Sequence, residues 1–101
     1  MTWKIELTDE AKAELGGLDN SVQKSVAAGL MKLNESPQLR GHSLTGNLAG
    51  YRALAVGKKQ IRIIYRIERD QVLVVVIAIG HRRNNEVYLE ASTRTGDSPS
   101  Q

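Results

Sequence analysis

The sequence contains an unbroken run of eight apolar residues, Val72–Ile79, which is followed directly by Gly80. Most residues of this run are β-branched, and β-branched side chains favour strands. A strand that is apolar on both faces is covered on both faces, so the run predicts an interior strand of a sheet. It is also much shorter than the roughly 20 apolar residues of a membrane-spanning helix. We therefore expect a globular domain built on a central strand, with no membrane partner.

Three further strand candidates precede this run. Thr2–Leu7 alternates polar and apolar residues, which indicates a strand with one buried face. Tyr51–Val56 and Gln60–Ile67 are separated by the turn residues Gly57 and Lys58. Consecutive strands joined by short turns pair in antiparallel fashion, so these two strands and the central strand should form an antiparallel meander.

Capping residues and apolar spacing predict three helices, each beginning after a side chain that can accept a backbone hydrogen bond. The candidate caps are Thr8 or Asp9, Asn20 or Ser21, and Asn84 or Asn85. The first helix should stop at Gly16–Gly17, the second before Pro37 and the third at about Ala91. The glycine-containing segment 37–50 should be a loop.

The elements follow one another in the order β-α-α-β-β-β-α, which predicts a small α+β domain over residues 1–94. The two N-terminal helices should pack on one face of an antiparallel meander sheet. Arg62 and Arg66 alternate with apolar residues along their strand, so they should point out of the other face, which we expect to be open. Residues 95–101 are polar and should form a disordered tail.

Residue types that form disulfides or bind metals are scarce. The chain has no cysteine and two histidines, His42 and His81. These numbers exclude a disulfide framework and a thiolate zinc site, and they argue against a cluster of histidine ligands. We therefore expect neither a metal nor a cofactor. The N-terminus lacks the apolar segment of a secretory signal, and the chain without cysteines suits the cytoplasm.

Positive charge is concentrated in the second half of the chain. Residues 1–39 hold four lysines against six acids, whereas residues 40–101 hold ten lysines and arginines against five acids, a net charge of +5. Most of these cations are arginines, and arginine can bind a phosphate through two parallel hydrogen bonds. The distribution favours a polyanionic partner. A basic surface that serves only solubility is the alternative.

An arginine-lined sheet face could bind and cleave an RNA phosphodiester without a metal. The 2′-hydroxyl must lose a proton and attack the phosphate, the charge on the phosphorane must be stabilised, and the 5′-oxygen must be protonated. The candidates at one end of the predicted sheet are Arg52, Arg62, His81, Arg82, Arg83, Glu86 and Tyr88. Each could instead be a surface or packing residue, because exposed strand arginines keep sheet surfaces soluble and helical tyrosines commonly pack.

Five motifs resemble, in order and spacing, the pattern of the RelE/ParE toxin superfamily. They are Leu44-Thr45-Gly46, Gly50-Tyr51-Arg52, the stretch Ile61–Arg66, the stretch Ile77–Arg83, and Glu86-Val87-Tyr88. The resemblance spans residues 3 to about 91 and implies the same order of elements. It also implies a toxin of a type II toxin-antitoxin system, whose cognate antitoxin inactivates it in a tight complex that binds operator DNA through the antitoxin.

Within the superfamily the chain is more similar to the RelE branch, because of Glu86-Val87-Tyr88. RelE-like toxins are mRNA interferases, endoribonucleases that depend on the ribosome, cleave mRNA in the A site without a metal, inhibit translation and arrest growth. The resemblance implies catalytic positions at Arg52, Arg62, Arg82 and Tyr88, with His81 as a further proton-transfer candidate. The expected RNA-binding residues are Lys58, Lys59, Arg66 and Arg83.

Leu54 departs from the RelE pattern, which has a lysine with a proton-transfer role at this position. Leu54 should share a strand face with Arg52 and point at the same phosphate, so a lysine at position 54 should raise cleavage. Leucine is compatible with the ParE branch, whose members inhibit DNA gyrase by binding it and have no nuclease activity. Gyrase inhibition, or a toxin that has lost its activity, is therefore the alternative to mRNA cleavage.

Overall fold

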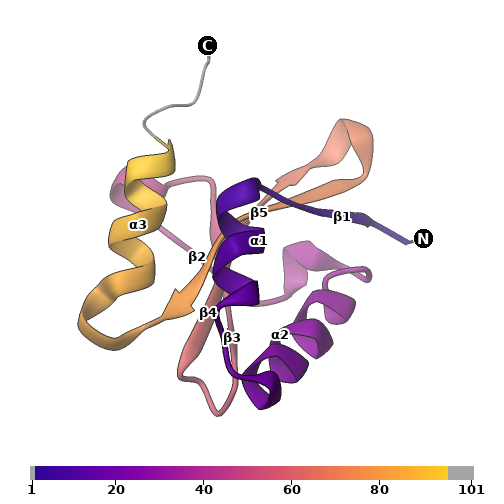
Figure 1. The fold of residues 1–101 in the computed structure, drawn as a ribbon. Coiled ribbons are helices and arrows are strands. Elements are labelled where there is room, and N and C mark those ends of the chain that lie inside the picture. Colours follow the sequence, from indigo (N-terminus) through magenta and orange to yellow (C-terminus); the bar gives the residue numbers. More distant parts are fainter. Residues whose placement is uncertain (1, 96–101) are drawn as a thin grey trace.

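The apolar run forms most of β5 (Leu73–His81), an interior strand that lies between β1 and β4 (Figure 1). The structure, a computed structural model, describes residues 2–95. Its five-stranded sheet has the order β1-β5-β4-β3-β2. The other strands are β1 (Lys4–Leu7), β2 (His42–Ser43), β3 (Arg52–Val56) and β4 (Ile61–Glu68). The predicted interior strand is confirmed.

Strands β3, β4 and β5 form the predicted antiparallel meander, and two other strands extend it. β1 pairs with β5 in parallel, with Lys4 opposite Leu73, so the sheet is mixed rather than antiparallel throughout. β2 pairs with β3 and lies inside segment 37–50, which the sequence predicts as a loop. A strand of two residues is too short to give an alternating pattern, so the sequence does not predict it.

The helices are α1 (Asp9–Gly16), α2 (Asn20–Lys32) and α3 (Glu86–Thr95). The hydroxyl of Thr8 accepts a hydrogen bond from the Ala11 N–H at 3.2 Å, which confirms Thr8 as the first cap. The cap of α2 is Asp19, one residue before the predicted position. None of the helices in residues 2–95 is long and apolar enough to cross a membrane.

Helix α3 is longer than the sequence predicts, because it continues beyond Ala91 to Thr95. The Thr95 hydroxyl lies within hydrogen-bond distance of the Ser92 and Asn47 carbonyls, at 3.0 Å and 3.3 Å. The remainder of the predicted polar tail, residues 96–101, lies outside the described residues.

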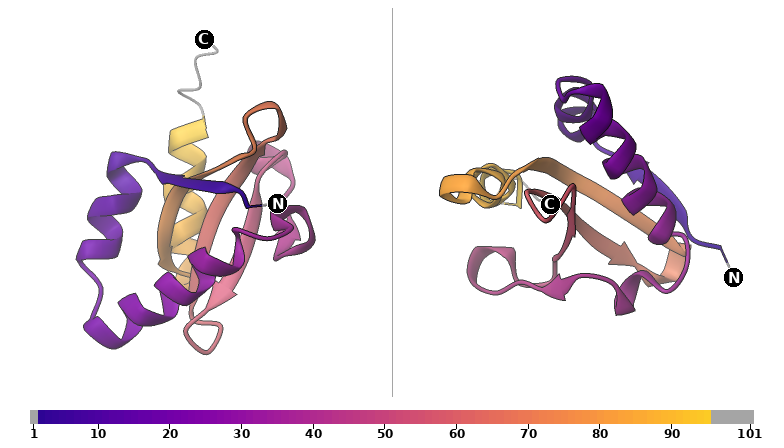
Figure 2. Two further views of the ribbon diagram at one scale, coloured as in Figure 1. Left: turned by 90° about the vertical axis from the view of Figure 1, so that its right-hand side faces the viewer. Right: turned by 90° about the horizontal axis from the view of Figure 1, so that it is seen from below.

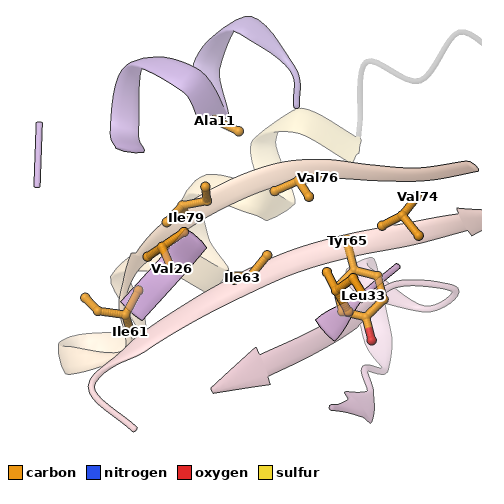
Figure 3. Close-up of a cluster of buried hydrophobic side chains, with 9 residues drawn as sticks. All are labelled: Ala11, Val26, Leu33, Ile61, Ile63, Tyr65, Val74, Val76 and Ile79. Atoms are coloured by element: carbon orange, nitrogen blue, oxygen red, sulfur yellow. The ribbon is translucent and has the colours of Figure 1, made fainter. Parts of the chain in front are cut away.

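Helices α1 and α2 contribute to a core cluster on one face of the sheet, which we call the first face (Figure 3). The buried members are Ala11, Val26, Leu33, Ile61, Ile63, Tyr65, Val74, Val76 and Ile79. Helix α2 meets β3 at Gly29, where a Cβ would lie 2.6 Å from Val56 Cγ1 and 3.5 Å from Leu54 Cδ2. The absence of a side chain at Gly29 therefore lets α2 lie directly on Leu54 and Val56.

The opposite, second face is covered as well, which corrects the expectation of an open face. Helix α3 and the segment 44–50 lie over it (Figure 2). Its buried members are Leu48, Ala53, Ile64, Leu73, Val75, Ile77, Ala78, Val87 and Ala91. The prediction failed because α3 and segment 44–50 each supply few apolar residues, and only their meeting on the sheet makes a second core.

A β-bulge in β5 sets which residues face each core. Ile64 pairs with Ala78 and Tyr65 pairs with Val76, so Ile77 is an extra residue without a partner in β4. Ile77 and Ala78 consequently both belong to the cluster on the second face. The alternation of side chains before the bulge is therefore out of step with the alternation after it.

Glu14 on α1 and Arg94 on α3 bind the backbone of β5 at this bulge. The Ile79 N–H donates to Glu14 Oε1 at 3.0 Å, and Arg94 Nη1 donates to the Ile77 carbonyl at 2.8 Å. Arg94 also makes two hydrogen bonds with the Glu14 carboxylate, at 2.9 Å and 3.0 Å. Strand β1 pairs with β5 only as far as Val76, so these side chains bind backbone groups that β1 leaves free.

Replacement of Arg94 by alanine should destabilise the fold by about 2 kcal/mol, because a carboxylate and a backbone carbonyl lose a charged donor. The Arg94 and Glu14 side chains are only 18% and 27% exposed, so water replaces these bonds poorly. The control is Lys4→Gln, which removes an ion pair whose side chains are 72% and 52% exposed and should cost less than about 1 kcal/mol. Urea unfolding of the two variants measures both values, and equal losses would contradict the structural role of Arg94.

Tyr65 makes stability depend on pH, because its buried hydroxyl lies 2.9 Å from both the Pro37 and Arg40 carbonyls. Burial raises the pKa of this hydroxyl above the ordinary value of 10.0, against smaller opposing effects of Arg52 and Arg40. The unfolded chain therefore loses this proton first, which favours unfolding as the pH rises past 10.0. The wild type should be more stable than Tyr65→Phe at neutral pH, and this advantage should shrink between about pH 9 and about pH 11 in urea unfolding. A constant difference would show that Tyr65 keeps no raised pKa.

Candidate functional site

Positive side chains gather at the end of the sheet where β3 turns into β4 and where β5 ends. We call them the turn-end cations; they are Lys58, Lys59, Arg62, Arg82 and Arg83. The Arg82 N–H donates to the Gln60 carbonyl at 3.0 Å, which holds the end of β5 beside the β3–β4 turn. None of the five side chains forms an ion pair with a carboxylate in residues 2–95. Their charge is therefore available to an anionic ligand.

Arg62 is the most constrained of the turn-end cations. It lies on the second face between Ala55 and Gly80, the residues opposite it in β3 and β5. Its Nη1 donates to the Lys59 carbonyl at 2.6 Å, and its buried Nε has no hydrogen-bond partner. An unsatisfied buried donor on a cation is costly, so Arg62 is poised to bind an acceptor such as a phosphate oxygen.

Tyr88 reaches the same face because α3 begins beside Gly80. A Cβ at Gly80 would lie 3.5 Å from Val87, so the bare backbone of β5 lets Val87 pack closely against it. Tyr88 follows Val87 and packs, half-buried, against the second-face cluster. The connection to α3 is tight, since Asn84 and Asn85 both have left-handed backbone conformations. Asparagine tolerates this conformation better than most residues.

Arg62, Arg82 and Tyr88 thus provide two cations and a phenolic hydroxyl around one end of the sheet. Two guanidinium groups, of which Arg62 is held by the Lys59 carbonyl, can stabilise charge that develops on a phosphate. A tyrosine hydroxyl can exchange a proton when it lies within hydrogen-bond distance of the reacting oxygen. Gly80 is the residue that sequence reasoning missed at this site. The signal for it is a glycine directly after the apolar run, where a second element can approach the backbone closely.

Arg52 lies far from these residues. It pairs with Tyr65 on the first face, at the opposite end of β3 from the turn, so the sheet separates it from Arg62. Its guanidinium group holds the neighbouring loop through bonds to the Arg40 carbonyl at 3.0 Å, the Ser43 hydroxyl at 2.9 Å and the Gly41 carbonyl at 3.4 Å. The sequence predicts Arg52 together with the other candidates at one end of the sheet, and the structure does not place it there.

Leu54 does share a strand face with Arg52, as expected, but that face is covered by α2. Leu54 packs against the first-face cluster and lies close to Gly29. Position 54 therefore cannot point at a phosphate bound by Arg62 on the second face. A leucine fits this environment, and the proton-transfer lysine of the RelE pattern would not.

His81 lies on the other face of the sheet from Arg62, and Arg66 is paired with a carboxylate. His81 pairs with Ile61 on the first face and lines a recess with the carboxylates of Glu14, Glu86 and Glu90. Arg66 is on the second face, but its Nε donates to Glu68 at 2.6 Å. Burial opposes the charge of Arg66, whereas hydrogen bonds and charge interactions with Glu68 and Tyr51 outweigh burial and raise its pKa.

Comparison with known proteins identifies the family. A family model described as the ParE toxin of type II toxin-antitoxin system, parDE, matches residues 5–86. The mRNA interferase toxin RelE of Escherichia coli is 28% identical over 94 residues, which cover 93% of this chain and 98% of the relative. The solved structure of an E. coli RelE mutant in the free state is 26% identical and aligns with a TM-score of 0.78, covering 93% of this chain and 98% of that chain.

A mutant of the same toxin has also been solved in complex with a peptide of the antitoxin RelB. It is 25% identical to this chain, with a TM-score of 0.72, and the match covers 90% of this chain and 95% of that chain. The resemblance read from the five motifs is thereby confirmed. The chain belongs to the family of ParE toxins of type II toxin-antitoxin systems, within the RelE/ParE superfamily.

Proposed function

We propose that this toxin is an mRNA interferase, a ribosome-dependent endoribonuclease that cleaves mRNA in the A site by attack of a 2′-hydroxyl on the adjacent phosphate. The observation that carries this proposal is Arg62, whose buried Nε has no partner beside the unpaired cations of the turn end. Such a group suits the negative charge that grows on a phosphorane. The similarity to RelE, an mRNA interferase by name, supports the same activity.

The three side chains have separate roles in this proposal. Arg62 and Arg82 stabilise the phosphorane oxygens, and the Tyr88 hydroxyl moves a proton to or from the reacting oxygens. Lys58, Lys59 and Arg83 bind flanking phosphates through charge. Arg52 and His81 take no part in the chemistry, because they lie on the other face of the sheet.

A cognate antitoxin should bind this toxin and inactivate it, as the RelE complex with a RelB peptide suggests. An acidic segment of the antitoxin would compete with RNA for the turn-end cations. The long-range part of that attraction is electrostatic, so it is weakened by salt. Binding of operator DNA by the resulting complex would then depend on the antitoxin.

Gyrase inhibition is the second candidate, and two observations favour it. The matching family model is described as a ParE toxin. Leu54 packs under α2 and leaves β3 without a proton-transfer side chain on either face. A nuclease with one acid-base group fewer is slower but still a nuclease, since such groups typically contribute about 10²–10⁴-fold each. We therefore rank mRNA cleavage first.

Arg62→Ala should reduce cleavage of mRNA on programmed ribosomes by about 10²–10³-fold, because one preorganised charge at the transition state is lost. Tyr88→Phe should reduce it by about 10²-fold or more, because only the hydroxyl is removed. Lys12→Gln is the matched control, since it removes one exposed positive charge on α1, beside β1 at the other edge of the sheet from β3. The cleavage rate of a saturated toxin–ribosome complex, measured at codon resolution, gives all three values.

Full cleavage by both Arg62→Ala and Tyr88→Phe would overturn the assigned site. Absence of cleavage by the wild type, together with gyrase-dependent DNA breaks in cells that express it, would establish the gyrase alternative instead. Circular dichroism and urea unfolding of each variant separate loss of activity from loss of folding.

Leu54→Lys should lower stability without raising cleavage. A lysine here must either bury its charge against α2 or push the helix away from β3, which should cost about 1–3 kcal/mol. Leu54→Met is the control, because it keeps an apolar side chain of similar size and should cost less than about 1.5 kcal/mol. A rise in cleavage with Leu54→Lys would show that position 54 reaches the reacting phosphate after all.

A further inference from the structure

A second concave surface lies at the other end of the sheet from the turn-end cations. This cleft has a volume of about 270 Å³ and forms where the start of β3, the loop before β2 and the turn between β4 and β5 meet. It is lined by Gln38, Ser43, Gly50, Tyr51, Arg52, Ile67 and Arg69. Ile61 begins β4 at the turn end and Ile67 lies near its other end, so the cleft lies roughly 20 Å from the turn end at about 3.3 Å per residue.

The cleft is positively charged and its central cation is fixed in place. Arg52 is held by three loop groups, and its bond to Ser43 links two residues that both line the cleft. Neither Arg52 nor Arg69 forms an ion pair with a carboxylate in the described part of the chain. A preorganised guanidinium group with unused N–H donors is well suited to a phosphate.

The loop that holds Arg52 has little freedom to move away. Gly41 has a φ of +60°, and a Cβ there would lie 2.2 Å from the Ala53 carbonyl oxygen. The buried Tyr65 hydroxyl also bonds to the Pro37 or Arg40 carbonyl at 2.9 Å, which ties the loop to β4. The protein's own contacts therefore hold the shape of the cleft.

One other lining residue points to more than a bare anion. The Oε1 atom of Gln38 is buried and has no hydrogen-bond partner, so a ligand with an N–H or O–H group would satisfy it.

We propose that this cleft binds one nucleotide, with its phosphate on Arg52 and Arg69 and a donor group of its base or ribose on Gln38. The identification of that nucleotide as part of an RNA bound by the toxin rests on the proposed function. The cleft lies away from Arg62 and Tyr88, so it would anchor RNA without taking part in cleavage.

The test is titration of the free, isotope-labelled protein with uridine or adenosine 5′-monophosphate, followed by NMR. Amide signals of residues 38–43, 51 and 69 should shift on binding. Arg69→Gln should weaken binding about tenfold, because it removes one charge-assisted contact. The Arg69 side chain makes no hydrogen bond or ion pair in residues 2–95, so this variant should fold normally. Lys12→Gln is again the charge-matched control and should bind like the wild type.

A second variant, Gln38→Met, tests recognition beyond charge. It should bind inorganic phosphate as the wild type does but lose the extra affinity for a nucleotide. Equal wild-type affinities for inorganic phosphate and the nucleotides would overturn nucleotide recognition, as would binding that Arg69→Gln leaves unchanged. Tighter binding of an acidic peptide with the same signal shifts would assign the cleft to a protein partner.

These measurements use no ribosome and no cleavage, so their failure is distinct from failure of the proposed function. If nucleotides bind in the cleft but no mRNA is cut, the cleft proposal stands and the proposed enzymatic activity is wrong. If cleavage depends on Arg62 but the cleft binds no nucleotide, the enzymatic activity stands and the cleft proposal is wrong. Arg62→Ala should leave nucleotide binding in the cleft unchanged, because the two sites lie at opposite ends of β4.

Discussion

The contact between Glu14, Arg94 and the backbone of β5 is the interaction on which the arrangement of this fold depends. Near the bulge in β5, a peptide N–H and a carbonyl face a strand edge that β1 does not reach. A carboxylate from α1 and a guanidinium from α3 bind these groups and each other. One ion pair thus joins the first helix, the interior strand and the last helix, and it fixes α3, which carries Tyr88.

Much of the fold could be predicted from local patterns. The run that begins at Val72 marked the interior strand, the hydroxyl of Thr8 marked the start of α1, and turn residues marked the meander. These signals come from neighbouring residues, so they are readable without knowledge of the tertiary structure. The length of α3 and the covering of the second face depend on contacts between Thr95 and Asn47 and on packing between distant segments. Such contacts leave no periodic signal.

The candidate site was predicted in part, and the reason lies in strand register. Arg62, Arg82 and Tyr88 were identified by residue type and spacing, and the structure brings them to one end of the sheet. Arg52 was grouped with them because it lies on the neighbouring strand. Pairing of Arg52 with Tyr65 places it on the other face, and no composition argument contains that information. The chain consequently carries two separate basic regions where the sequence suggested one.

The extra residue in β5 has a consequence for how such chains vary. Loss of Ile77 itself would restore regular alternation from Val76 to Ala78 and would leave Gly80 opposite Arg62. Loss of Ile79, after the bulge, would instead bring His81 opposite Arg62, which would then lie beside an imidazole instead of open backbone. Insertions and deletions in this strand can therefore change the chemistry of the site without substituting any of its residues, so roles in homologous chains should be assigned by counting from the bulge.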